Sequence, residues 1–149
     1  MSDALTSDAR VDELIEGFEF LEDWDERFRY IIDLGRKLKP MDEALKTDET
    51  KVDGCTSQVW MVARLEGEPP KLTFLADSDA HIVRGLIAIL MALYDGRTAR
   101  EILDLDAEGT IARLDLAQHL SPNRANGLFA MVGRIRSFAA EALAADATA

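Results

Sequence analysis

Residues 58–96 read QVWMVARLEGEPPKLTFLADSDAHIVRGLIAILMALYDG and carry the pattern from which the fold follows. Residues 58–65 are rich in β-forming side chains, and every second one is apolar, which is typical of a strand with one apolar face. Residues 66–70, Glu-Gly-Glu-Pro-Pro, have the composition of a turn. Residues 71–76 return to β-forming side chains, so the sequence predicts a β-hairpin with a loop of about five residues.

The helix expected over residues 80–94 provides cover for this hairpin. It is apolar on most of its circumference, as expected of a helix packed on several sides, and Asp77 or Ser78 is expected to cap its start. Two amphipathic helices are expected before the hairpin, one over residues 11–20 and one from residue 24 up to Pro40, because apolar side chains recur there at three- and four-residue steps.

The remaining segments are shorter or less regular. Residues 41–50 lose the helical period and predict a surface connection, which leads into a short extended piece over residues 51–53. The segment Thr98-Ala99-Arg100-Glu101 matches a capping box and predicts a short helix. Residues 111–116 are too few for their period to distinguish a helical turn from irregular structure. Ser121-Pro122 predicts the start of a long last helix, because Ser caps well and Pro suits the first helical position.

Length and composition indicate one soluble domain. The chain has 149 residues, 48% of them hydrophobic and 30% charged, which is enough for one packed core; residues 1–10 and 142–149 are expected to fray. A net charge of −11 disfavours nucleic acid and anionic membranes as partners. The apolar run from Gly85 to Tyr94 has about half of the ~20 residues needed to cross a bilayer. The acidic N-terminus lacks the layout of a secretion signal, so we expect a cytoplasmic protein.

Cys55 is the residue with the clearest capacity for chemistry. A single cysteine rules out an internal disulfide and a Cys-rich zinc or iron–sulfur site, which leaves an inert buried residue or a reactive thiol. The thiol lies in a small, polar segment, but the acidic charge of the chain and Asp53 oppose its ionisation. Arg124, expected in the first turn of the last helix beside free backbone N–H groups, is a candidate for offsetting this charge, and a solvated surface arginine is the alternative.

Other candidate residues give weaker signals. His81 is expected at the surface in the first turn of a helix and His119 in a loop, and their spacing indicates no catalytic triad. Trp60 is expected in the core, with a partner-binding patch as the alternative. No HExxH, Gly-rich phosphate loop or EF-hand pattern is present, so metal and nucleotide sites are not expected.

Three segments together resemble the SufE family, which includes the CsdE proteins. They are VDGCTSQVW at residues 52–60, DSDAHIVRGLI at residues 77–87 and LSPNRANGL at residues 120–128, and the similarity extends over roughly residues 28–139. The resemblance implies an α+β fold with a small antiparallel sheet of about three strands flanked by helices. It implies no cofactor or metal of the protein's own.

The resemblance also implies a function. A pyridoxal-phosphate-dependent cysteine desulfurase of the SufS or CsdA type places a persulfide on its own cysteine, and Cys55 takes the outer sulfur. An iron–sulfur scaffold of the SufB type then receives it. The chain is expected to be an accessory sulfur-transfer protein rather than an independent enzyme. Arg124 is expected to stabilise the thiolate or persulfide or to assist docking, and Gly54, Asp77 and Asn126 to support the loop and the site.

Two alternatives to the sulfur carrier stay open. A non-covalent module that regulates the desulfurase by conformation needs no reactive thiol. A thiol-based redox enzyme or sensor needs one, but the chain contains no second cysteine to resolve an oxidised Cys55.

Overall fold

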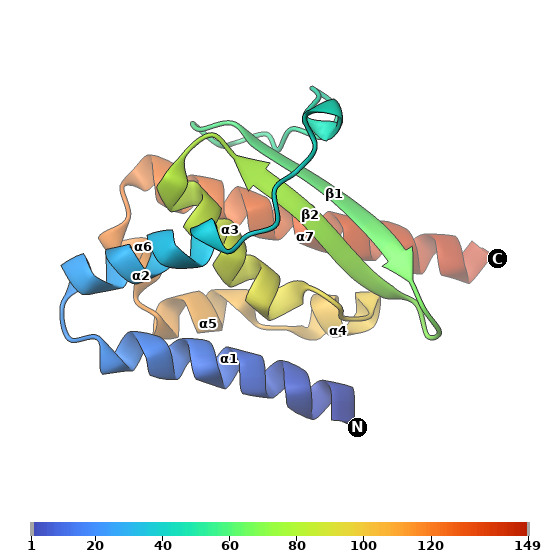
Figure 1. The fold of residues 1–149 in the computed structure, drawn as a ribbon. Coiled ribbons are helices and arrows are strands. Elements are labelled where there is room, and N and C mark those ends of the chain that lie inside the picture. Colours follow the sequence, from blue (N-terminus) through green and yellow to red (C-terminus); the bar gives the residue numbers. More distant parts are fainter. Residues whose placement is uncertain (1, 149) are drawn as a thin grey trace.

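The computed structural model describes the backbone of residues 2–148 and the side chains of residues 9–145. The chain forms an α+β fold in which a β-hairpin packs among helices (Figure 1). In chain order the elements are α1 Ser2–Phe20, α2 Trp24–Arg36, the 3-10 helix η1 Glu43–Leu45, β1 Val59–Glu66, β2 Lys71–Ser78, α3 His81–Tyr94, α4 Ala99–Asp104, α5 Ala107–Arg113, α6 Leu116–His119 and α7 Pro122–Thr148.

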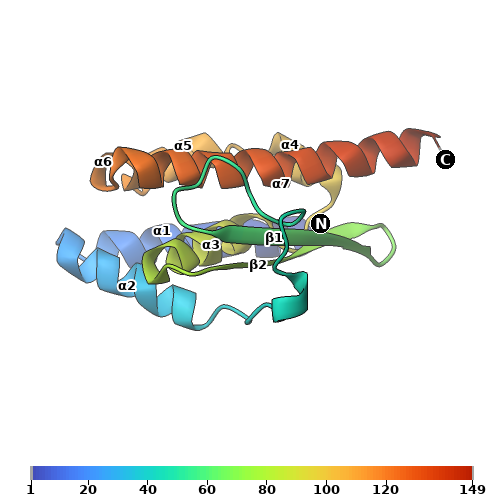
Figure 2. The same cartoon turned by 90° about the horizontal axis from the view of Figure 1, so that it is seen from above.

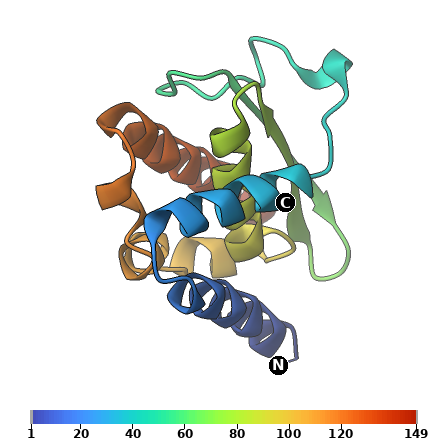
Figure 3. The same ribbon diagram turned by 60° about the vertical axis from the view of Figure 1, so that its left-hand side comes forward.

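The helices lie on both sides of the hairpin and of α3. Figure 2 shows that α7 runs along one side of this middle layer and that α2 lies on the opposite side. Figure 3 shows that the connection from α2 to β1 projects at the opposite end of the molecule from α1. The core is centred on α3, whose buried side chains include Leu86, Ile87, Leu90 and Leu93. This burial confirms the predicted cover for the hairpin.

The crossing of α2 and α3 is a close helix contact. A Cβ on Gly35 would lie 2.6 Å from the backbone nitrogen of Gly85, and a Cβ on Gly85 would overlap the carbonyl oxygen of Ile31. A Cβ at either position would be closer to the neighbouring helix than any normal non-bonded contact. Glycine at both positions therefore allows the two backbones to approach.

The sheet has two strands, where about three were expected. β1 and β2 pair in antiparallel register from Val59 with Ser78 to Glu66 with Lys71. The expected extended piece at residues 51–53 contributes one isolated bridge, between Lys51 and Trp60. It forms no strand because the chain turns away directly afterwards, at Gly54, where φ is +90°.

The predicted cap of α3 was wrong. The N-cap residue is Ala80, which makes no side-chain capping hydrogen bond. Asp77 and Ser78 remain in β2, because the antiparallel pairing continues to Ser78. The capping box at Thr98 and Glu101 is present as predicted, and the Ser121 hydroxyl accepts a hydrogen bond from the Arg124 backbone nitrogen at the start of α7, at 3.3 Å.

Three further expectations need correction, and a fourth remains open. α2 ends at Arg36, before Pro40 is reached. His119 is the last residue of α6 rather than a loop residue, because the ambiguous segment forms two short helices separated by Asp115 at φ +60°. Trp60 is half-buried, with the Lys46 ammonium 5.2 Å from its ring centroid, so it is not a core residue. α1 and α7 extend into both terminal stretches, where fraying stays a prediction.

Candidate functional site

Cys55 lies on a loop whose two ends are joined by backbone hydrogen bonds. The Val52 nitrogen donates to the Val59 oxygen, and the Met61 nitrogen donates to the Thr50 oxygen, each at 2.8 Å. These bonds continue the antiparallel pattern for a short distance beyond the hairpin. The base of the loop is therefore part of the sheet framework.

Asp79 also holds the base of the loop. Its carboxylate oxygen Oδ1 accepts a hydrogen bond from the Gln58 backbone nitrogen at 3.1 Å, and its own nitrogen donates to the Gln58 oxygen at 3.4 Å. Gln58 directly precedes β1 and Asp79 directly follows β2, so the two residues lie next to the last strand pair, Val59 with Ser78. Asp79 stands in one of the segments that resemble the family, but its role was not predicted because it depends on strand register.

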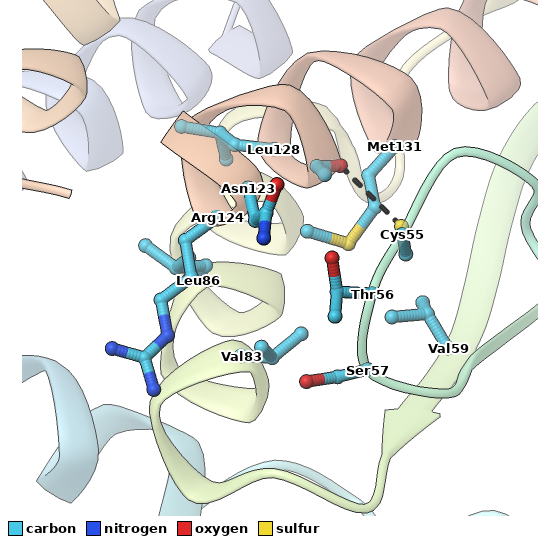
Figure 4. Close-up of a pocket in the computed structure, with 11 residues that line it drawn as sticks. Cys55, Thr56, Ser57, Val59, Val83, Leu86, Asn123, Arg124, Leu128 and Met131 are labelled. Atoms are coloured by element: carbon cyan, nitrogen blue, oxygen red, sulfur yellow. Dashed lines mark hydrogen bonds between the residues drawn. The ribbon is translucent and has the colours of Figure 1, made fainter. Parts of the chain in front are cut away.

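The tip of the loop places Cys55 against the first half of α7. The Cys55 thiol donates a long hydrogen bond, 3.6 Å, to the carbonyl oxygen of Gly127, drawn as a dashed line in Figure 4. A Cβ on Gly127 would lie 3.5 Å from the Cys55 sulfur, which is an ordinary van der Waals distance. Gly127 was quoted with its segment but was not predicted as a site residue.

A small cavity adjoins the thiol. Its volume is about 20 Å³, which is room for about one water-sized group. Thr56, Ser57 and Asn123 contribute polar atoms to its lining. The apolar part of the lining consists of Val59, Val83, Leu86, Leu128 and Met131. The sulfur thus faces a largely apolar space formed by β1, α3 and α7.

These surroundings favour the protonated thiol. Cys55 is half-buried, and burial raises the pKa of its thiol because the apolar surroundings solvate the thiolate poorly. The carbonyl of Gly127 acts in the same direction, since it accepts a hydrogen bond from the thiol and can donate none to a thiolate. The sequence suggested an anion-stabilising corner here, and this conformation of the loop does not provide one.

Arg124 reaches the same cavity but does not approach the sulfur. It lies in the first turn of α7, as predicted, it is exposed, and it contributes to the lining. Figure 4 shows its guanidinium group pointing away from Cys55. Asn126 is exposed and is not among the lining residues, whereas Asn123 and Gly127 are. For Gly127, helical spacing from Arg124 indicates this difference, because i+3 and i+4 share a face and i+2 does not.

Asp77 lies outside the cavity and anchors the connection between α2 and β1. Its side chain is buried and lies 3.4 Å from the Lys46 ammonium and 3.3 Å from Nε of Arg84. Its Oδ2 also accepts a hydrogen bond from the backbone nitrogen of Met41 at 3.4 Å. Asp77 therefore stabilises the segment that precedes the cysteine loop rather than the loop tip.

Neither histidine lines the cavity. His81 is exposed at the start of α3, and His119 is stacked on Trp24, with ring centroids 3.9 Å apart. In the part of the chain that the structure describes, no three His, Cys, Asp or Glu side chains gather in a way that could hold a metal ion. Among the same residues, no helix is both long and apolar enough to cross a membrane.

The fold and the site define a class: a small α+β domain with one thiol on a loop tethered at its base. Residues 12–139 match the family SufE, described as an Fe-S metabolism associated domain, so the chain belongs to the SufE family, as the resemblance indicated. It is 49% identical over 129 residues to an uncharacterized SufE-like protein of Rhizobium meliloti (strain 1021), covering 85% of this chain and 92% of that protein.

Two further comparisons agree with this assignment. An uncharacterized SufE-like protein of Rhizobium etli is 49% identical over 130 residues, covering 86% of this chain and 88% of that protein. The solution structure of a hypothetical protein from Thermus thermophilus superposes with a TM-score of 0.74 at 20% identity, over 91% of this chain and 96% of that one. At this identity the structural likeness supports the fold alone.

Proposed function

We propose that Cys55 accepts sulfur from the persulfide of a pyridoxal-phosphate-dependent cysteine desulfurase and delivers it to an iron–sulfur assembly scaffold. The observation that carries this proposal is the placement of the chain's single thiol on a short loop, tethered at its base and held at its tip by one side chain in a small cavity. The cytosolic location expected from the sequence is part of the proposal.

The transfer is a thiol exchange. The Cys55 thiolate attacks the outer sulfur of the donor's persulfide, and a new S–S bond forms on Cys55. The S–S bond of the donor breaks, its cysteine leaves as a thiolate, and the outer sulfur remains as the terminal sulfur of a persulfide on Cys55. Sulfur is neither oxidised nor reduced overall, so the step needs no further oxidant or reductant.

In this proposal the loop moves before the attack. Cys55 is half-buried and faces α7, whereas an attacking thiolate needs an in-line approach to the donor sulfur. Gly54, in the left-handed region at φ +90°, lies beside Cys55 and suits a hinge position. Arg124, at the mouth of the cavity, then stabilises the thiolate or persulfide or binds the donor enzyme. Asp77 and Asn126 are supporting residues in this proposal.

Intact mass measurement with the cognate desulfurase and cysteine tests the proposal. We expect a gain of one sulfur atom and faster turnover of the desulfurase, and Cys55→Ser should abolish both. Stimulation that persists with Cys55→Ser would instead support a non-covalent regulatory module. Rapid consumption of peroxide by the protein alone would support the redox alternative.

A matched pair of arginine variants tests the role of Arg124. Arg100 is also exposed and also lies in the first turn of a helix, α4, but it does not line the cavity. We expect Arg124→Ala to slow transfer about 10-fold, the rate equivalent of about 1.4 kcal/mol, and Arg100→Ala to leave it unchanged. An effect on KM alone would assign Arg124 to docking, whereas an effect on kcat would assign it to the chemical step.

A further inference from the structure

The contact between the loop tip and α7 depends on a proton. The hydrogen bond from the Cys55 thiol to the Gly127 carbonyl oxygen exists only while the sulfur is protonated, because a carbonyl donates no hydrogen bond. The other wall groups near the sulfur are largely apolar, and the cavity has room for about one water-sized group. An ionised sulfur in this position would lose a donor contact and most of its hydration.

The charged groups around the site do not replace this hydration in the observed conformation. Arg124 of α7 lines the cavity, but its guanidinium points away from the sulfur (Figure 4). Arg84 of α3 is paired with Asp77 at 3.3 Å. On the loop side, Asp53 is exposed, and Asp79 accepts a hydrogen bond from Gln58 at 3.1 Å; both are anionic and oppose a thiolate.

The base and the tip of the loop are held by different kinds of interaction. The base is joined by backbone hydrogen bonds of 2.8 Å, which do not change with the state of the sulfur. The tip is joined to α7 by a 3.6 Å contact and by apolar packing of the Cys55 side chain. A change confined to the sulfur can therefore release the tip while the base stays in place.

We propose that Gly127 is a positioning residue whose carbonyl retains Cys55 only while the sulfur is protonated, so that ionisation of the sulfur releases the loop from the cavity. This inference rests on the proposed sulfur transfer and describes how its nucleophile is controlled. Ionisation and loop release are thermodynamically linked. The free energy by which the cavity favours the thiol over the thiolate equals the free energy by which ionisation favours the released loop.

The coupling gives the empty and the loaded protein different loop positions. In the empty protein the thiol is neutral and retained; docking that draws the loop out also restores the ordinary pKa of the thiol and thus raises the thiolate fraction. A hydropersulfide is a stronger acid than the corresponding thiol, so the loaded protein carries an anionic terminal sulfur at neutral pH. Its loop is released, and the sulfur is presented to the next acceptor.

Backbone 13Cα relaxation of the full chain, which does not depend on exchangeable amide protons, is recorded from about pH 6 to about pH 10.5 and tests the coupling without a desulfurase. The folded-state pKa of Cys55 is raised by burial, so the retained state is favoured below the ordinary thiol pKa and is lost as pH rises through the raised value. We expect order parameters of residues 53–57 to fall from about 0.85 to below about 0.6, at the pH where thiolate absorbance appears.

Cys55→Ser is the matched control for this titration. Its hydroxyl donates the same hydrogen bond and does not ionise in this pH range, so its loop should remain ordered throughout. An equal loss of order with Cys55→Ser, or a loop that stays ordered after thiolate formation, would overturn the proposal. Failure of sulfur transfer with every desulfurase would leave these measurements unaffected, which separates the two hypotheses.

A second comparison separates charge from size. Persulfidation of Cys55 by an inorganic polysulfide and S-methylation each add one heavy atom to the sulfur, but only the persulfide ionises at neutral pH. At about pH 7.5 we expect the loop to be mobile after persulfidation and ordered after S-methylation. If the loop were equally mobile in both forms, its release would be due to the size of the added atom and the proposal would be overturned. A loop that stays ordered after persulfidation would contradict the release of the loaded form.

Discussion

Two places where glycine lies at a tertiary contact differ in how much room they leave. At the crossing of α2 and α3, a Cβ on Gly85 would overlap the carbonyl oxygen of Ile31, and a Cβ on Gly35 would lie 2.6 Å from a backbone nitrogen. At the contact of α7 with the cysteine loop, a Cβ on Gly127 would lie 3.5 Å from the Cys55 sulfur. The first contact joins two backbones in the core, whereas the second leaves space around the side chain that leaves the cavity in the proposed transfer.

Gly85→Ala is the strongest test of this difference. The added methyl group forces α2 and α3 apart, and overpacking of this kind costs about 3 kcal/mol of unfolding free energy. Urea denaturation measures the loss. Gly133→Ala is the matched control, because a Cβ there meets nothing within 4 Å; in this exposed part of α7 it should stabilise the protein by up to about 1 kcal/mol. Equal stability of Gly85→Ala and wild type would contradict the tight crossing.

Asp77→Asn tests whether the segment before the loop belongs to the rigid framework. Removing the charge leaves Lys46 and Arg84 without the buried carboxylate that they share, and we expect a loss of about 2 kcal/mol in urea denaturation. Asp33→Asn is the control, since its pair with Arg36 is exposed and should contribute less than about 0.5 kcal/mol. Similar small effects for both variants would show that the buried pairs do not anchor the segment.

Gly127→Ala should have the smallest effect of the three. The new methyl group reaches only van der Waals contact with the sulfur, and alanine is favoured over glycine inside a helix. We therefore expect the unfolding free energy to stay within about 1 kcal/mol of wild type, with the balance towards stabilisation. A loss as large as that of Gly85→Ala in the same measurement would mean that the loop tip is packed as tightly as the core.

Much of the fold was predictable because its signals are local. The period of two in residues 58–65, the turn at residues 66–70 and the apolar helix that follows correspond to β1, β2 and α3 within a few residues. The capping box at Thr98 and Glu101 was also predictable, since it satisfies backbone groups three residues apart. A third strand was not formed, because strand pairing depends on how long two segments stay side by side, and that is not a local property.

The site was predictable in part for the same reason. Cys55 and Arg124 were both selected from the sequence, and the structure brings them to one cavity without direct contact. Asp77 was selected, but its partners Lys46 and Arg84 were not, because they come from separate segments of the chain. Asn126 was favoured over Gly127, although helical phase places Gly127 on the face that meets the loop.

Composition, periodicity and motif spacing were sufficient for the hairpin, the main helices, the family and the choice of Cys55 as the candidate nucleophile, because each of these depends on neighbouring residues along the chain. The protonation state favoured at Cys55 could not be read in that way. It depends on a carbonyl 72 residues away and on apolar walls contributed by β1, α3 and α7. Burial and electrostatics at a site are sums over spatial neighbours, and folding is what makes those residues neighbours.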